Sequence, residues 1–102
     1  MRIASLVFLL LFIQKVSAQS PEEQLRKLNI SLPAVSQPIA NYVKFVRTGN
    51  LIFLAGHGPT GADGVTIIWK VGSDLSIEEG YQAARTTSIS LLATLQQAIG
   101  SL

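Results

Sequence analysis

The chain has 102 residues, enough for one small domain, and it contains no cysteine, which excludes disulfide bonds and zinc–thiolate sites. Eight residues are basic and six are acidic, but two of the bases lie among the first 18 residues. The other six bases balance the six acids, and this neutrality argues against binding to nucleic acid or to anionic membranes.

Residues 1–18 have the features of a secretory signal peptide. Arg2 supplies a positive start, residues 3–13 are apolar, and Val16-Ser17-Ala18 is typical of a cleavage site. The apolar run is shorter than the ~20 residues that span a bilayer, so a retained anchor is the less favoured alternative. We therefore expect an exported protein, periplasmic or extracellular, with no membrane contact once the leader is removed.

Residues 19–41 are expected to form a short helix and then an extended segment. Ser20 can cap the helix, Pro21 suits its first position, and Glu23 stands where it completes a capping box. The helix is expected to end near Asn29. The segment that follows contains two prolines, which disfavour regular structure.

The strongest local signal is a β-hairpin in the middle of the chain. Residues 41–47 and 51–55 are β-prone, and Gly49-Asn50 between them is typical of a tight turn, because glycine readily adopts positive φ. The second strand is apolar at every position. A strand that does not alternate is usually covered on both faces. We expect a helix against one face and a further partner against the other.

A second tight turn and a third strand are expected after the hairpin. Asp63-Gly64 suits the turn, residues 65–70 form a β-prone run, and residues 71–75 lead on to a long helix. Three strands and one helix leave an open sheet edge and a half-covered sheet. The sequence is therefore typical of the front part of a module that pairs with another chain.

Residues 56–61, at the exit of the second strand, read Gly-His-Gly-Pro-Thr-Gly. This spacing matches the dinucleotide fingerprint, but that fingerprint opens a helix, whereas here Pro59 and a turn lead into another strand. We interpret the segment as a glycine-rich turn. His57 is the sole histidine, so we expect no metal site, and it is the best polar candidate to line a pocket. The alternative is a loop histidine with a local hydrogen bond.

The clearest predicted element is a long helix that begins after Ser76. Ser76 and Glu79 form a second capping box, and Gly100 stands where a C-terminal glycine cap belongs. Helical spacing predicts one apolar face, made of Ile77, Tyr81, Ala84, Ser88, Leu91, Leu92, Leu95 and Ile99. The opposite row is polar but uncharged and consists of Gln82, Thr86, Ser90, Thr94 and Gln97. This row is either a neutral solvated face or a surface that meets another one.

Several segments together form one recognisable pattern. They are Ala40-Asn41-Tyr42-Val43, Arg47-Thr48-Gly49-Asn50-Leu51, Ala55-Gly56-His57 with Pro59, Lys70-Val71-Gly72-Ser73-Asp74-Leu75, and Glu79-Gly80-Tyr81 with Ala83-Ala84-Arg85. The pattern covers residues 25–100 and resembles the RidA/YjgF family, also called the L-PSP endoribonuclease or chorismate-mutase-like family. By this resemblance, residues 42–102 are a partial domain of the family, with only the N-terminal part of the module present.

The resemblance implies an α+β fold in which a chorismate-mutase-like sheet is backed by a long helix. It also implies a homotrimer, in which three subunits pack their sheets together and form pockets between them. Such packing would supply the second cover of the apolar strand.

The resemblance further implies hydrolysis of reactive enamines and imines, such as 2-aminoacrylate, to a ketoacid and ammonia without metal or cofactor. The pocket candidates are Tyr42, Ala55, Gly56, His57 and Gly58, and no catalytic residue is assigned. Family members carry Ser-Gly-Gln where this chain has Ala-Gly-His, and their carboxylate-binding arginine lies in the C-terminal half of the module. We therefore expect the deaminase activity to be impaired in this chain. Two alternatives stay open: a non-catalytic module that binds small carboxylates, and a ribonuclease.

Overall fold

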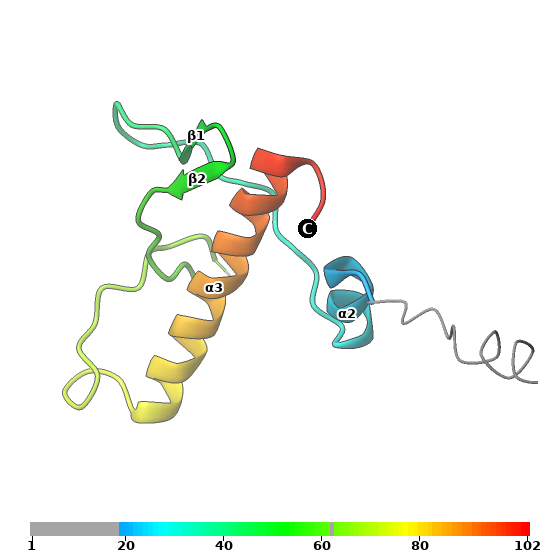
Figure 1. The fold of residues 1–102 in the computed structure, drawn as a ribbon. Coiled ribbons are helices and arrows are strands. Elements are labelled where there is room, and N and C mark those ends of the chain that lie inside the picture. Colours follow the sequence, from blue (N-terminus) through cyan, green and yellow to red (C-terminus); the bar gives the residue numbers. More distant parts are fainter. Residues whose placement is uncertain (1–18, 62) are drawn as a thin grey trace, which may run out of the picture.

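The computed structural model describes residues 19–61 and 63–102, and the predicted signal peptide lies outside the described residues. Helix α2 (Pro21–Lys27) comes first, and strands β1 (Phe45–Thr48) and β2 (Leu51–Leu54) form an antiparallel hairpin. The long helix α3 (Ile77–Ile99) follows and packs its C-terminal half beside the hairpin (Figure 1). The predicted α+β class, with a sheet backed by a long helix, is confirmed.

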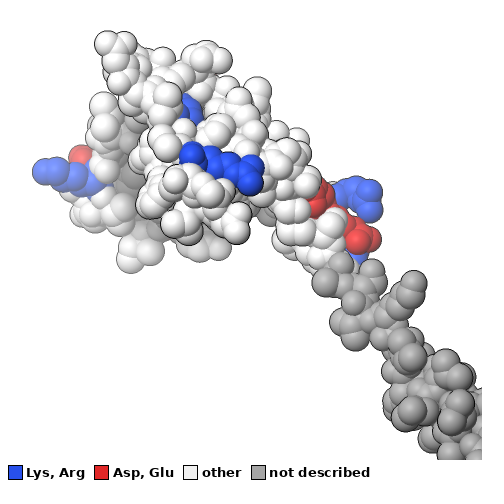
Figure 2. Space-filling view, turned by 45° about the horizontal axis from the view of Figure 1, so that its top comes forward, with Lys and Arg blue, Asp and Glu red and all other residues white. Residues whose placement is uncertain are grey.

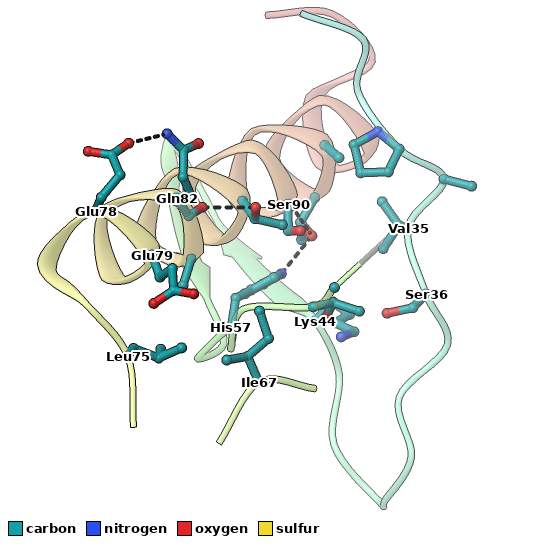
Figure 3. A pocket seen from close by; sticks show the side chains of 18 residues that line it. Val35, Ser36, Lys44, His57, Ile67, Leu75, Glu78, Glu79, Gln82 and Ser90 are labelled. Atoms are coloured by element: carbon teal, nitrogen blue, oxygen red, sulfur yellow. Dashed lines mark hydrogen bonds between the residues drawn. The ribbon is translucent and has the colours of Figure 1, made fainter. Parts of the chain in front are cut away.

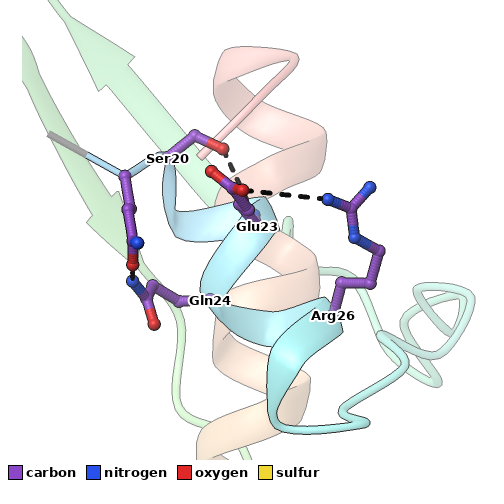
Figure 4. A network of polar contacts seen from close by, with 5 residues as sticks. Ser20, Glu23, Gln24 and Arg26 are labelled. Carbon is purple, nitrogen blue, oxygen red and sulfur yellow. Dashed lines mark hydrogen bonds and ion pairs between the residues drawn. The ribbon is translucent and has the colours of Figure 1, made fainter. Parts of the chain in front are cut away.

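Helix α2 is held by its own terminal residues. The Ser20 hydroxyl accepts the backbone N–H of Glu23 at 3.2 Å, as predicted (Figure 4). The Glu23 carboxylate pairs instead with Arg26 at 3.9 Å, so only half of the predicted capping box is present. Asn29 has φ +54° just after the helix, and it ends α2 in the left-handed conformation that commonly terminates helices.

The hairpin has the predicted turn and a shorter first strand than predicted. Thr48 faces Leu51 across the turn, and Gly49 has φ +54°. Strand β1 starts at Phe45 rather than at residue 41, although the Ala55 N–H still donates to the carbonyl of Lys44 at 2.9 Å. Beyond this pair the chain after β2 turns away, so the residues before Lys44 have no strand to pair with.

The two faces of the hairpin differ in burial. Cross-strand register places Phe45, Ile52 and Leu54 on one face, and all three are half-buried. Val46, Leu51 and Phe53 share the other face and are exposed. Helix α3 therefore covers one side of the apolar strand, and within residues 19–61 and 63–102 nothing covers the other side.

The prediction of a third strand over residues 65–70 is wrong. Residues 65–70 make one isolated bridge, between Thr60 and Thr66, and no ladder. The turn before it does form, with the Gly61 N–H donating to Val65 O at 2.8 Å and Gly64 at φ +80°. A strand needs a hydrogen-bonded neighbour, and the described residues offer none beyond that bridge. Ile68 is accordingly 89% exposed.

Helix α3 begins and ends as the sequence predicts. Ser76 and Glu79 form the complete capping box, and Gly100 ends the helix at φ +90°. The 23 residues of α3 make a rod of about 35 Å, whereas a strand of four residues spans about 13 Å. The hairpin therefore covers one part of the helix and leaves the first turns uncovered.

The face by which α3 packs is not the predicted apolar face. The buried residues of α3 are Ala83, Ala93 and Thr94, whereas Ile77 and Tyr81 are exposed. The buried residues, which we call the inward stripe of α3, have small and uncharged side chains. Such side chains let the helix approach the hairpin closely. The sequence left open whether the polar row is a solvated face or meets another surface. The structure supports the second interpretation.

Within the two described ranges, no helix combines the length and the apolar character that crossing a bilayer requires.

The capping box makes the stability of the chain depend on pH. The Glu79 carboxylate accepts the Ser76 N–H and the Ser76 hydroxyl, each at 2.8 Å. The backbone bond, followed by the hydroxyl bond, holds the pKa of Glu79 below its ordinary value of 4.5. A depressed pKa stabilises the fold above the unfolded value, and this stabilisation is lost as pH falls through the folded value.

We therefore expect the melting temperature of the wild type to exceed that of Glu79→Gln at neutral pH. This difference should shrink as pH falls below 4.5, where the carboxyl becomes neutral. Circular dichroism melts of both proteins across acidic pH measure it. A difference that does not change with pH would contradict the assignment.

Candidate functional site

A groove of about 740 Å³ runs along the inward face of α3. Its far wall is the segment 33–36, and its floor comes from the glycine-rich exit of β2 and from Ile67. Figure 3 shows Val35 and Ser36 on the wall opposite the helix, with His57 between them and α3. The inward stripe of small residues on α3 leaves this space open, because no long side chain fills it.

The imidazole of His57 is fixed at both nitrogens. Nδ1 lies 2.7 Å from the carbonyl oxygen of Ala55, and Nε2 lies 2.8 Å from Oγ1 of Thr94 (Figure 3). The first contact is local and the second joins the loop after β2 to α3. The histidine therefore locks the groove wall to the helix and has one defined orientation.

Thr94 is the most buried side chain among the residues described, at 1% exposed. Its hydroxyl lies within hydrogen-bond distance of His57 and also of the carbonyl oxygen of Ser90, at 3.1 Å. Every buried polar side-chain atom in the described ranges has a partner. The polar centre of the groove is thus fully paired, as buried polar groups require.

Charged groups lie at opposite ends of the groove. Lys44 lies at one end, and Glu78 and Glu79 lie at the other, with His57 between them (Figure 3). The Glu79 carboxylate is occupied by the helix cap, and Glu78 accepts a hydrogen bond from Gln82 at 2.9 Å. Lys44 has no carboxylate partner among the ion pairs of the described residues. Its ammonium is therefore available to a ligand.

The structure separates the five residues that the sequence selects as pocket candidates. His57 lines the groove, and Ala55 contributes the carbonyl that fixes its ring. Gly56 and Gly58 flank His57 in the backbone but are not part of the lining. Tyr42 is exposed and lies outside the groove, with its ring 5.8 Å from the Lys44 ammonium.

His57 is the one sequence candidate that lines the groove, and three polar lining residues that the sequence did not select bear on its chemistry. Thr94 and Ser90 belong to the polar, uncharged row of α3, and the lack of charge in that row was the available signal. Lys44 gave no signal, because its place at the groove depends on the backbone pairing with Ala55. Within the described parts of the chain, no cluster of three His, Asp or Glu side chains could hold a metal ion.

Known proteins are similar to this chain in fold and sequence. A crystal structure from Shewanella oneidensis MR-1, provisionally assigned as an endoribonuclease, superposes with a TM-score of 0.74 and 29% identity over 82% of this chain. Over this range the chain has the fold of the matched part of the solved protein. The likeness supports the chorismate-mutase-like fold that the sequence motifs predict.

Two further proteins are similar over most of the chain. The protein Atu1372 of unknown function from Agrobacterium tumefaciens has a TM-score of 0.64 and 29% identity over 78% of this chain. Protein TCP17 of Trypanosoma cruzi is 33% identical over 78 residues, or 76% of this chain. No family profile matches the sequence.

The chain spans about half the length of the proteins it matches. It covers 56% of the Shewanella oneidensis protein, 48% of Atu1372 and 49% of TCP17. Activities of those whole proteins therefore extend to this chain only as proposals.

Proposed function

We propose that the chain carries part of the site of a RidA-like deaminase. The reaction is hydrolysis of a reactive enamine or imine, such as 2-aminoacrylate, to a ketoacid and ammonia. The observation that carries the proposal is the fixed imidazole of His57 in the groove, on a fold shared with the solved relative. An oriented imidazole suits proton transfer, because one ring nitrogen can donate a proton while the other accepts one.

Lys44 is the counter-charge for a substrate carboxylate in this proposal. It shares the groove with His57, and its ammonium has no carboxylate partner among the described residues. A charge-assisted hydrogen bond of this kind contributes about 1.5–3 kcal/mol.

The test is release of ammonia when 2-aminoacrylate is generated in the presence of the 102-residue chain. We expect turnover by the wild type, and its loss in His57→Ala. Lys70→Ala removes a lysine outside the groove and serves as the matched control for Lys44→Ala, which we expect to raise KM. Absence of turnover by the folded wild type would overturn the deaminase assignment.

A non-catalytic module that binds small carboxylates is the second candidate. It is favoured by Ala55, which stands where members of the resembled family carry a serine hydroxyl. Binding of pyruvate without any ammonia release would support this candidate.

A ribonuclease is the third candidate, because the Shewanella oneidensis relative is provisionally assigned as an endoribonuclease. The distribution of charge speaks against it. Figure 2 shows one face of the molecule, on which basic and acidic side chains are few and scattered. RNA binding usually requires a basic surface or a stacking platform beside one. Cleavage of RNA that is lost in His57→Ala would revive this candidate.

Assembly and export complete the proposal. The exposed apolar face of Val46, Leu51 and Phe53 supports packing against further copies in a homotrimer. Light scattering of the purified protein measures the number of copies.

For export, the intact mass of the protein from its own source should correspond to a start at Gln19.

A further inference from the structure

We infer that Thr94 and His57 form a two-residue proton relay that opens on the groove. The inference rests on the proposed function for its substrate, a carbon–nitrogen double bond in the groove. Its geometry rests on three contacts in a row: Ala55 O to Nδ1, Nε2 to Oγ1, and Oγ1 to Ser90 O.

The first contact sets the tautomer of His57. The Ala55 carbonyl oxygen only accepts, so Nδ1, at 2.7 Å, must carry a proton. In the neutral ring the lone pair then lies on Nε2, which points at Thr94. The ring is therefore fixed as a base whose accepting nitrogen faces α3.

The second contact sets the direction of the Thr94 hydroxyl. This hydroxyl has one proton and two acceptors within reach, Nε2 at 2.8 Å and the Ser90 carbonyl at 3.1 Å. With His57 neutral, the proton goes to Nε2, since nothing else fills that lone pair. The Ser90 carbonyl keeps its helical hydrogen bond in either case.

Protonation of His57 completes the row without moving a heavy atom. Nε2–H then donates to Oγ1, and the hydroxyl proton turns to the Ser90 carbonyl. Three contacts between two carbonyl acceptors need three protons, and the imidazolium with the hydroxyl supplies them. The neutral ring supplies one proton fewer, so in that state the contact between Oγ1 and the Ser90 carbonyl carries no hydrogen bond.

The reaction step follows from this exchange. A water in the groove forms a bond from its oxygen to the iminium carbon, and the π electron pair moves to nitrogen. The water proton passes to Oγ1 while the Thr94 proton passes to Nε2. The nitrogen of the resulting carbinolamine takes this proton back from the relay. The carbon–nitrogen bond then breaks, ammonia leaves with the bonding pair, and the hydroxyl loses its proton to solvent as the ketoacid forms.

Few charged groups face this pair. Lys44 reaches the groove from the segment before β1, and Glu78 and Glu79 reach it from the first turn of α3. The segment 33–36 and the lining residues of the loop after His57 carry no charge. The charged side chains that share the groove with the relay are therefore one cation and two carboxylates.

Nuclear magnetic resonance of the histidine ring tests the relay without any substrate. The full chain has one histidine, so its ring signals need no assignment to a residue, and only Nδ1 and Nε2 have to be told apart. For the neutral ring we expect the Nδ1–H tautomer, kept in Thr94→Ser, and a changed Nε2 signal in Thr94→Val. An Nε2–H tautomer in the folded wild type would overturn the relay, whatever the activity.

Ammonia release then tests its use in catalysis. We expect Thr94→Val to lower kcat about 100-fold with little change in KM, and Thr94→Ser to stay close to wild type. A matching shift in the pH profile of kcat should accompany the loss. Equal kcat in all three proteins would overturn the relay, whereas no turnover in a wild type with the expected tautomer overturns the proposed deaminase reaction instead.

Discussion

Replacing Ala93 by leucine is expected to destabilise the chain by about 1–3 kcal/mol. Ala93 is 5% exposed and lies on the inward stripe of α3, where the helix approaches the hairpin. A leucine there must either shift the helix away from the residues that bury Ala93 or turn into the groove that Ala93 also lines, and both change the packing of the helix. Urea unfolding followed by circular dichroism gives the change in the free energy of unfolding.

Ala84→Leu is the matched control for this change. Ala84 lies on the same helix but is exposed, and the substitution is identical. We expect its free energy of unfolding to stay within about 0.5 kcal/mol of wild type. The opposite ranking, with Ala84→Leu the more harmful change, would show that the helix packs by the apolar face the sequence predicts.

Thr94→Val is expected to cost about 1–3 kcal/mol of stability, because it leaves Nε2 of His57 without its partner in a half-buried site. Valine has the same shape as threonine, so the change isolates the hydroxyl. Thr86→Val is the control. The Thr86 hydroxyl donates to the Gln82 carbonyl at 3.0 Å, and among the described residues Thr86 makes no side-chain hydrogen bond to another element, although it also lines the groove.

The difference between the two threonine variants therefore measures the tertiary hydrogen bond to His57. Both free energies come from the same urea titration, and a Thr94→Val change repeated in a His57→Ala background should lose most of its cost. Equal losses in Thr94→Val and Thr86→Val would mean that the contact between helix and loop contributes nothing to the fold.

Elements with local signals could be predicted from the sequence. The helix starts at Ser20 and Ser76 depend on a hydroxyl that reaches an N–H three residues on, and the turn at Gly49 depends on one permissive φ. These capping and turn interactions involve residues close together in the chain, so they can be recognised from the sequence. The hairpin and both helices follow from them.

Features that depend on distant contacts could not be predicted. The orientation of α3 is set by how closely it approaches the hairpin, and this favours small side chains over the larger apolar ones such as Ile77 and Tyr81. The third strand fails for a similar reason. Its β-prone residues 65–70 would need a partner strand that the described residues do not supply.

The candidate site also contains one residue that the sequence could indicate and one that it could not. His57 could be selected because a single histidine after a buried strand is conspicuous in the sequence. Its partner Thr94 is 37 residues away, and only the packing of α3 brings the two together. Tyr42 was selected through the family resemblance, and the structure places it outside the groove.

The most direct test of the account is to map where a small carboxylate binds. Pyruvate titrated into the isotopically labelled chain, followed by nuclear magnetic resonance, should shift the signals of His57, Thr94 and Lys44 in a saturable way. Tyr81 and Trp69, which are exposed outside the groove, should not move. Saturable shifts confined to Trp69 and Tyr81, with His57 unchanged, would contradict the assignment of the groove as the functional site.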